Sequence, residues 1–396
     1  TDPAGNEVGV AFEIPREIAV FSGGAKEGAA TLEAGRVAGT WRRDLAAVGD
    51  LDVTLRHLRL AGEVEGRQAE LLTLAELSVT QDTEEKDGKI GSTGTFLLKA
   101  LEVVPPEGEV ARIAIGGIEA TSTARGFDVA GLRRIQELTG PGTVAPALDF
   151  EKVASQMLDF LSGPNWDGFG GSTAVSGIVV EGRDKGTPFR AGRLGFRFDI
   201  DNSGAKGALQ LALEAQDVHA ADLAAGPVPP AFVPHGASLA ATLERLPFKE
   251  LAAIAKGAVE SAQANDGVPS DDAMVEMQAV VLNARPALAI EGVSMDAKEL
   301  HLAGLGGVAV DPESALLVSG SFTVQLAGLD ALKAWVDREG RTDPELAQFA
   351  PVVVALRGLG EPGKLGGATA HTYRIELQRS GDITVNGTPW EMLMPP

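Results

Sequence analysis

The chain has 396 residues, 44% of them apolar and 22% charged, which is typical of a soluble globular protein with two or three domains and excludes a disordered chain. Its 49 glycines and 22 prolines, with only 5% aromatic residues, favour many turns between strands over long helical bundles. The formal charge of -21 repels phosphate backbones and excludes nucleic acid as a partner, although the same charge also simply keeps a protein soluble.

The chain contains no cysteine, which excludes disulfides, thiolate catalysis, zinc-thiolate sites and a lipidated cysteine. No stretch approaches the roughly 20 apolar residues that span a bilayer. A start at Thr1-Asp2-Pro3 is typical of a processed chain. We therefore expect that a signal or N-terminal anchor has been removed.

Residues 1–147 are predicted to form a β-rich N-terminal lobe. Apolar and polar residues alternate from Asp50 to Arg56, and after His57 the apolar set shifts by one residue, which indicates a bulge or a strand end. Three further strands, separated by turns, complete an antiparallel meander around residues 70–79, 95–104 and 110–120. The glycine- and proline-rich residues 139–147 mark the predicted domain boundary.

Residues 148–265 are predicted to form the first sheet-plus-helix unit of a C-terminal lobe. Asp149 can cap a helix with an apolar stripe, and Pro247 begins a second helix at its preferred first position. Between them two alternating strands flank a turn at Asn202-Ser203-Gly204. Their apolar side chains are candidates for contact with a hydrophobic ligand: Leu194, Phe196, Phe198, Ile200, Leu209, Leu211 and Leu213.

Residues 266–396 are predicted to repeat this scheme after a polar linker at 263–272. Phe322 and Val324, on an alternating strand, complete the set of ligand candidates. A helix begins at Gly328-Leu329-Asp330 and ends at Gly340. Pro344 begins another helix, whose inward side chains we expect to be Leu346, Phe349, Ala350 and Val353.

Strand alternation followed by a short apolar-faced helix thus occurs three times, at Phe127-Asp128-Val129, at Leu246-Pro247-Phe248 and at Gly328-Leu329-Asp330. Such short helices are not stable alone in water and must pack on a sheet. We therefore predict a β-rich α+β fold of curved antiparallel sheets, with short amphipathic helices packed on the concave faces.

Two loops resemble ligand-binding motifs but lack essential parts. Residues 358–364 have the spacing of a phosphate-binding P-loop, yet Leu365 replaces the required Ser or Thr and a strand follows. Residues 199–204 resemble the start of an EF-hand loop, but position twelve is Gln210 rather than a bidentate carboxylate. The first segment is rejected as a nucleotide site and the second is interpreted as a turn, and no cofactor or metal is predicted.

The five histidines show no metal-ligand spacing. Asp217 and His219 could point to the same side of a strand, which leaves open a hydrolase-type enzyme built on a carboxylate and an imidazole. We nevertheless predict a protein that is not an enzyme.

Residues 316–332 (LLVSGSFTVQLAGLDAL) and the closing strands at 382–390 resemble uncharacterised envelope proteins of Gram-negative bacteria, of the YdgA-like and AsmA-like style. The resemblance covers mainly residues 227–396 and defines no catalytic residues. It implies a periplasmic, membrane-associated protein that shields lipid in a groove.

Two non-enzymatic functions follow as hypotheses. The first is binding or shielding of a lipid or other hydrophobic ligand in an apolar trough, although the chain's own helices could fill that trough instead. The second is an envelope scaffold that pairs with a protein partner through its sheet edges.

Overall fold

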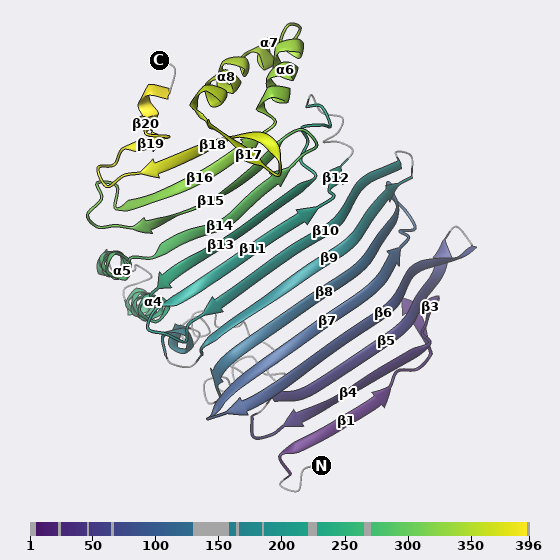
Figure 1. Cartoon of the computed structure of the whole chain (residues 1–396). Helices are drawn as coiled ribbons and strands as arrows, with labels where there is room; N and C mark the ends of the chain where they lie inside the picture. The colour runs from purple at the N-terminus through teal and green to yellow at the C-terminus, as the bar shows by residue number, and fades with distance from the viewer. Residues whose placement is uncertain are drawn as a thin grey trace. The chain divides into compact units, whose positions relative to one another are not determined.

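The computed structural model confirms the β-rich antiparallel fold (Figure 1): a large antiparallel sheet that does not close, accompanied by a few short helices. Its strands and helices divide into two compact units. Unit 1 comprises residues 1–189, 195–208 and 246–281, and unit 2 comprises residues 190–194, 209–245 and 282–396. The structure describes residues 5–22, 25–45, 47–64, 67–129, 158–163, 166–183, 186–220, 228–264 and 271–393.

The strands of unit 1 follow one another as antiparallel neighbours. β5 pairs with β6, β6 with β7, β7 with β8, and β8 with β9, while β1 pairs with β4 and β4 with β5. The strands are β1 (Glu7–Glu13), β2 (Glu17–Ser22), β3 (Ala25–Thr31), β4 (Ala34–Arg42), β5 (Ala47–Val64), β6 (Arg67–Lys86), β7 (Lys89–Val103), β8 (Val110–Asp128) and β9 (Gly168–Gly182). The predicted meander is therefore correct, with strands longer than expected.

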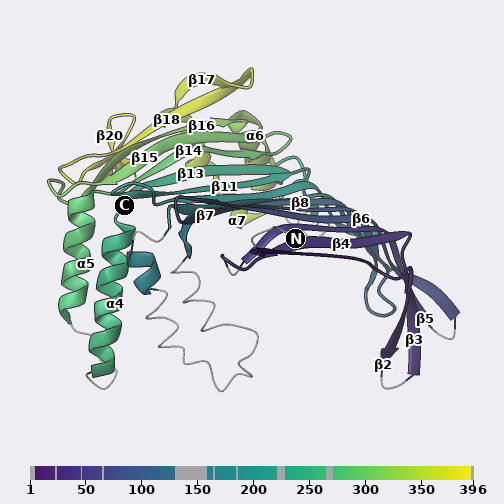
Figure 2. The same cartoon turned by 90° about the horizontal axis from the view of Figure 1, so that it is seen from below.

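The phase shift after His57 is a kink inside β5, not a strand end. His57 has a φ of 51°, and pairing with β6 continues on both sides of it. The first half of β5 pairs with β4 and the second half with β3. Figure 2 shows the β2–β3 hairpin turned away from β4. Ala100 in β7 and Gly177 in β9 also have positive φ, so similar kinks recur on alternate strands.

Unit 2 is also built from antiparallel neighbours. β13 pairs with β14, β14 with β15, β15 with β16 and β16 with β18, which also pairs with β17 and β19. These strands are β13 (Gly236–Leu246), β14 (Ala287–Asp296), β15 (His301–Val310), β16 (Val318–Ala327), β17 (Glu361–Leu365), β18 (Ala368–Leu377), β19 (Ile383–Val385) and β20 (Thr388–Pro389). β10 (Gly186–Asp201) and β11 (Gly207–Gln216) contribute residues to both units, and β12 is His219–Ala220.

The helices of unit 2 form its apolar core. α6 (Leu329–Glu339), α7 (Pro344–Ala347) and α8 (Ala350–Leu359) lie beside β17 and β18 in Figure 1. Leu329, Trp335, Val336 and Val353 are buried together, and the ring of Phe232 lies 5.5 Å from that of Trp335. The helix predicted from Gly328-Leu329-Asp330 is confirmed, and so is the inward position of Val353.

Two predictions about helices differ in part from the structure. The helix predicted from Pro344 begins there as α7, and Leu346, Ala350 and Val353 lie inward as expected, but α8 is a separate helix and Phe349 before it is 57% exposed. The polar linker predicted at 263–272 overlaps α4 (Phe248–Ala264) and α5 (Asp271–Ala284) by two residues at each end, and its residues 265–270 lie outside the described residues. α5 lacks a clear apolar stripe, because Met274 and Val275 are exposed while the buried positions are alanines.

Other predicted features lie outside the described residues. They are the boundary at 139–147, most of the helix from Asp149, and the helix expected after Val129. The division of the chain at residue 147 therefore stays a prediction. The helix predicted at Pro247 is confirmed, since α4 begins at Phe248.

Gly328 should be needed for the tight passage from β16 into α6. Its φ is 92°, and a Cβ there would overlap the carbonyl oxygen of Glu299. Gly366 also has a positive φ, of 56°, but nothing lies within 4 Å of its missing Cβ. We expect Gly366→Ala to cost about 1–2 kcal/mol of unfolding free energy through backbone strain, and Gly328→Ala to cost ~1–3 kcal/mol more through overlap. Urea denaturation measures both, and equal losses would refute the role of the overlap.

Candidate functional site

One face of the unit 1 sheet is lined by apolar side chains. Residues directly opposite each other on antiparallel strands share a face. The register aligns a first row of apolar residues across six strands: Phe12, Val37, Val53, Val79, Phe96 and Ala120. A second row crosses five strands: Leu55, Leu77, Leu98, Ile118 and Val175. We call these two rows, together with the two rows described next that lie beyond the kink at His57, the apolar face of unit 1.

The apolar rows continue beyond the kink. A residue in the left-handed conformation lets apolar positions three residues apart share a face. Leu55 and Leu58 are accordingly half-buried, while Arg56 and His57 between them are exposed. The rows beyond the kink are Leu58, Leu74, Leu101 and Ile115, and Leu60, Leu72, Val103, Ile113 and Val180.

The opposite face of the same strands is polar. The row next to Val53, Val79 and Phe96 contains Thr80 opposite Thr95, whose hydroxyls form a hydrogen bond. Thr121 and Ser172 are joined in the same way, at 2.8 Å. The strands are thus amphipathic, with one apolar and one polar face.

The side chains of the apolar face are covered only in part. Leu74 and Leu98 are buried, but most of the other members are half-buried, including Phe96 in the middle of the sheet. At the β1 end the exposure rises to 57% for Val10 and 54% for Phe12. Half-burial in mid-sheet means that neighbours on the same sheet cover these side chains incompletely, so the face can still lose water-exposed apolar area by binding a ligand.

An aromatic ladder of five rings adjoins this face. From Phe248 on α4, ring centroids follow at 6.2 Å to Trp166, 5.8 Å to Phe169, 6.0 Å to Phe198 and 5.8 Å to Phe196. Trp166 is 3% exposed, whereas Phe196 at the far end is 42% exposed. The ladder therefore runs from the core to the surface, and offset or tilted ring pairs of this kind stabilise by about 0.5–1.5 kcal/mol each.

Small residues and hydrogen bonds fix the ladder. A Cβ on Gly207 would overlap the ring of Phe248, and one on Gly171 would lie 3.4 Å from the ring of Phe198. The indole nitrogen of Trp166 donates to the carbonyl of Leu161 at 3.3 Å. Asn202, which is 2% exposed, donates to the carbonyl of Trp166 at 3.4 Å.

Two ion pairs include residues that directly follow members of the ladder in the sequence, Asp167 after Trp166 and Asp199 after Phe198. Arg125 donates two hydrogen bonds to Asp199, at 2.8 and 3.1 Å, and Lys89 lies 2.6 Å from Asp167. The hydrogen bond from Arg125 to Asp199 raises the pKa of the guanidinium despite its partial burial. These pairs place charges that offset each other beside Trp166 and Phe198 of the ladder.

The segment resembling an EF-hand is a turn, as predicted. Asp201 accepts hydrogen bonds from the backbone N–H of Ser203 at 2.9 Å and from its hydroxyl at 2.7 Å. These bonds lower the pKa of the Asp201 carboxyl. The residues of the P-loop-like segment from Glu361 to Leu365 form β17, which pairs with β18.

The predicted ligand candidates have different positions. Phe196 and Phe198 meet on the aromatic ladder, and Ile200 is half-buried further along β10. In unit 2, Leu194, Leu209 and Leu211 are half-buried and Leu213 is 43% exposed. Phe322 and Val324 share a face of β16 with residues on β14, β15 and β18.

This second apolar face, in unit 2, is partly covered by the chain's own helices. The row through Val324 ends at Tyr373, whose hydroxyl donates to the carbonyl of Leu356 on α8 at 2.8 Å. Burial raises the pKa of Tyr373. At the opposite ends of these strands lies an open depression of about 510 Å³, lined among others by Leu288, Val308 and Leu377. In unit 2 helices therefore cover one end of the apolar strands and leave the other open.

Local sequence patterns do not identify the apolar face of unit 1, Trp166 or Phe169 as parts of a site. The alternation of Leu51, Val53 and Leu55 was a signal for the face, but its continuity across strands depends on register. The ladder joins residues from β9, β10 and α4, which are far apart in the sequence.

Asp217 and His219 do not form a pair. Both are exposed, and no hydrogen bond or ion pair joins them in the described structure. Among the described residues, no three His, Asp or Glu side chains gather to hold a metal ion. The structure thus gives no geometric support to the hydrolase alternative.

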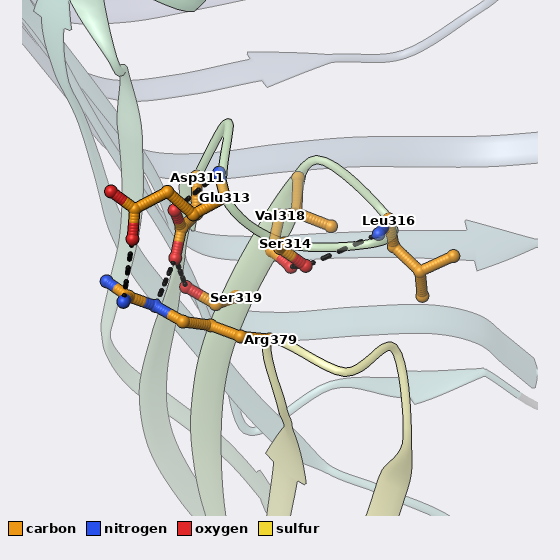
Figure 3. A network of polar contacts seen from close by, with 7 residues as sticks. All are labelled: Asp311, Glu313, Ser314, Leu316, Val318, Ser319 and Arg379. Carbon is orange, nitrogen blue, oxygen red and sulfur yellow. Dashed lines mark hydrogen bonds and ion pairs between the residues drawn. The ribbon is translucent and has the colours of Figure 1, made fainter.

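The densest polar cluster of unit 2 surrounds the buried carboxylate of Asp311 (Figure 3). It accepts hydrogen bonds from the Glu313 N–H at 3.1 Å, the Ser319 hydroxyl at 3.1 Å and Arg379 Nε at 2.8 Å. Arg379 also reaches Glu313 at 2.9 Å. The cluster links the turn between β15 and β16 to the loop after β18. Its polar groups are hydrogen-bonded or ion-paired to one another.

Asp311 should make stability depend on pH. Burial would raise the pKa of its carboxyl, but the hydrogen bonds and the charge of Arg379 outweigh burial and hold the pKa below its ordinary value of 3.8. A depressed folded pKa contributes stability that is complete above the unfolded pKa and is lost as pH falls through the folded one. We expect Asp311→Asn to be less stable than the wild type at pH 7, and the difference to shrink below about pH 4.

Chemical denaturation at several pH values measures this difference. Glu361→Gln, at an exposed position of the same unit where no described side chain pairs with the carboxylate, is the control and should differ little at any pH. A difference for Asp311→Asn that stays constant down to pH 2 would contradict the assignment.

Comparisons with models of protein families, with curated proteins and with solved structures find no match to this chain. None of the described helices is long and apolar enough to cross a membrane.

Proposed function

We propose that the protein binds or shields a lipid, or another hydrophobic ligand, along the apolar face of unit 1, without catalysing a reaction. One observation carries this proposal: aligned rows of apolar side chains cross five to six strands and stay half-buried. A ligand laid across these rows would remove from water the area that the sheet itself leaves exposed.

The energy available is sufficient for a long acyl chain. Burial contributes about 0.8 kcal/mol per CH₂, so a sixteen-carbon chain would gain roughly 12 kcal/mol before entropic and desolvation losses. Strands lie about 4.8 Å apart, so the five strands β5 to β9 offer a path of roughly 20 Å across the face. Phe196, the exposed end of the aromatic ladder, offers a further apolar contact.

The proposal includes a location. The resemblance of residues 227–396 to YdgA-like and AsmA-like envelope proteins supports a periplasmic protein that handles lipid. The absence of cysteine is compatible with an oxidising compartment.

A second candidate function is pairing with a protein partner through the edge strand β1. β1 pairs with β4, and no other described strand pairs with it (Figure 1). Its apolar residues Val10 and Phe12 are exposed, and it contains no Pro or Lys. Edge strands usually carry such protective residues, as β17 does with Pro362. An extended segment of a partner could therefore add to the sheet at β1.

Ligand binding is tested on β7, where adjacent residues point to opposite faces. We expect Phe96→Glu, on the apolar face, to weaken binding of a fluorescent long-chain fatty acid at least about tenfold, or ~1.4 kcal/mol. Thr95→Glu adds the same charge on the polar face and should leave the affinity unchanged. Fluorescence titration without detergent measures both affinities.

A milder variant, Val79→Thr, distinguishes loss of binding from loss of the fold, which Phe96→Glu could also cause. This change nearly keeps the volume of a neighbour on the apolar face but replaces one methyl group by a hydroxyl, so it should weaken binding several-fold while the circular dichroism spectrum stays unchanged. Equal affinities for wild type, Phe96→Glu and Val79→Thr, or no binding by the wild type, would refute the proposal.

The edge pairing is tested with a photo-crosslinking amino acid at position 10. If β1 receives a partner strand, this residue should form a crosslinked adduct in envelope extract, because backbone pairing brings the partner within contact. A second substitution, Ala11→Pro, should reduce the adduct, since proline cannot donate a hydrogen bond and disrupts strand addition. The same crosslinker at Thr95, on the polar face, is the control. Adducts of equal yield at positions 10 and 95 would contradict pairing at β1.

A further inference from the structure

We propose that unit 1 has a second binding site, a groove that binds a small phosphate ester through three arginines. The groove has a volume of about 430 Å³ and is lined by β1, β4, β5 and the segments before β2 and β4. Arg16, Arg36 and Arg56 line it, and we call it the arginine groove. It does not depend on the proposed function, because Arg36 and Arg56 lie on the polar face of these strands.

Strand register brings the arginines together. Arg36 on β4 lies opposite Thr54 on β5, and Ala34 lies opposite Arg56. Thr54 and Arg56 are two residues apart on one strand, so Arg36 and Arg56 are diagonal neighbours on one face. Arg16 joins them because its carbonyl accepts a hydrogen bond from the Leu32 N–H at 2.9 Å, which holds its segment beside the start of β4.

Acidic residues lie opposite two of the three arginines, Glu13 opposite Arg36 and Glu76 opposite Arg56, but no hydrogen bond joins them to the guanidinium groups in the described structure. None of the three guanidinium groups makes a hydrogen bond or ion pair with a described side chain, although three carboxylates line the same groove. Glu33 instead lies 3.4 Å from His57, and Asp52 accepts a hydrogen bond from Thr54 at 3.3 Å. The groove thus presents fifteen unused guanidinium N–H donors, five on each arginine.

The balance of charge defines the ligand. Three arginines against Glu13, Glu33 and Asp52 give a local sum of zero in a chain whose formal charge is -21. A polyanion such as nucleic acid would be repelled by the rest of the molecule, whereas a single phosphate can be held by guanidinium forks at short range. The carboxylates can accept hydrogen bonds from hydroxyl or ammonium groups of the same ligand. This chemistry fits a phosphate ester with hydroxyl or ammonium substituents, either as a free molecule or as the headgroup of a phospholipid.

Isothermal titration calorimetry with glycerol 3-phosphate tests the site. We expect the wild type to bind it, and Arg36→Gln and Arg56→Gln each to weaken binding at least about tenfold. Arg36→Lys should recover only part of the affinity, because lysine keeps the charge but loses the planar fork. Arg197→Gln is the matched control, since Arg197 is an exposed arginine of unit 1 outside the groove.

A second arm distinguishes the source of the phosphate. Flotation with phosphatidylcholine vesicles containing phosphatidylglycerol should show arginine-dependent binding if the groove takes a lipid headgroup. Binding of glycerol 3-phosphate alone would indicate a free ligand, and either result supports the site if Arg36→Gln abolishes it. Absence of both kinds of binding, or equal losses in Arg36→Gln and Arg197→Gln, would overturn the proposal. Phe96→Glu should leave phosphate binding intact, so failure of the fatty-acid proposal and failure of this one are distinguishable.

Discussion

The antiparallel register of amphipathic strands is the constraint on which the rest of unit 1 depends. Side chains alternate between two faces along each strand, so a register slip of one residue would move an entire apolar row to the polar face. The pairs Val53 with Val79 and Val79 with Phe96 show that the register is in phase across neighbouring strands. The kinks at His57 and Ala100 preserve this phase where the alternation in the sequence shifts by one residue.

A consequence of this register is that each face has its own chemistry. The apolar face is half-buried and suited to a hydrophobic ligand, whereas the polar face contains hydroxyl pairs and, near β1, the guanidinium groups of the arginine groove. Two ligands of opposite character could therefore use the same strands without competing for side chains.

Elements outside the strands stabilise the sheets at a few points. In unit 1 the ring of Trp166 joins α4 to β9 through its contacts with Phe248 and Phe169. In unit 2 the helices α6 and α8 bury Trp335 and Val353. A backbone carbonyl of α8 also accepts a hydrogen bond from the hydroxyl of Tyr373. Short helices gain their stability from such contacts, because isolated helices of this length are marginal in water. Gly207 leaves room for the ring of Phe248, and Gly328 allows α6 to begin beside the carbonyl of Glu299.

Local patterns in the sequence determined the class of the fold and the start of several elements. Alternation indicates strands because its period of two matches the pleat, and Pro247 and Gly328 mark helix starts through their fixed or left-handed backbones. Helix α5 escaped prediction because its apolar residues form no stripe, and the outward position of Phe349 could not be read because the helix breaks there. The aromatic ladder, the continuity of the apolar face and the arginine groove were decided only by tertiary structure. Each joins residues from separate strands or helices, and such pairings depend on register and long-range packing, which no local stretch of sequence specifies.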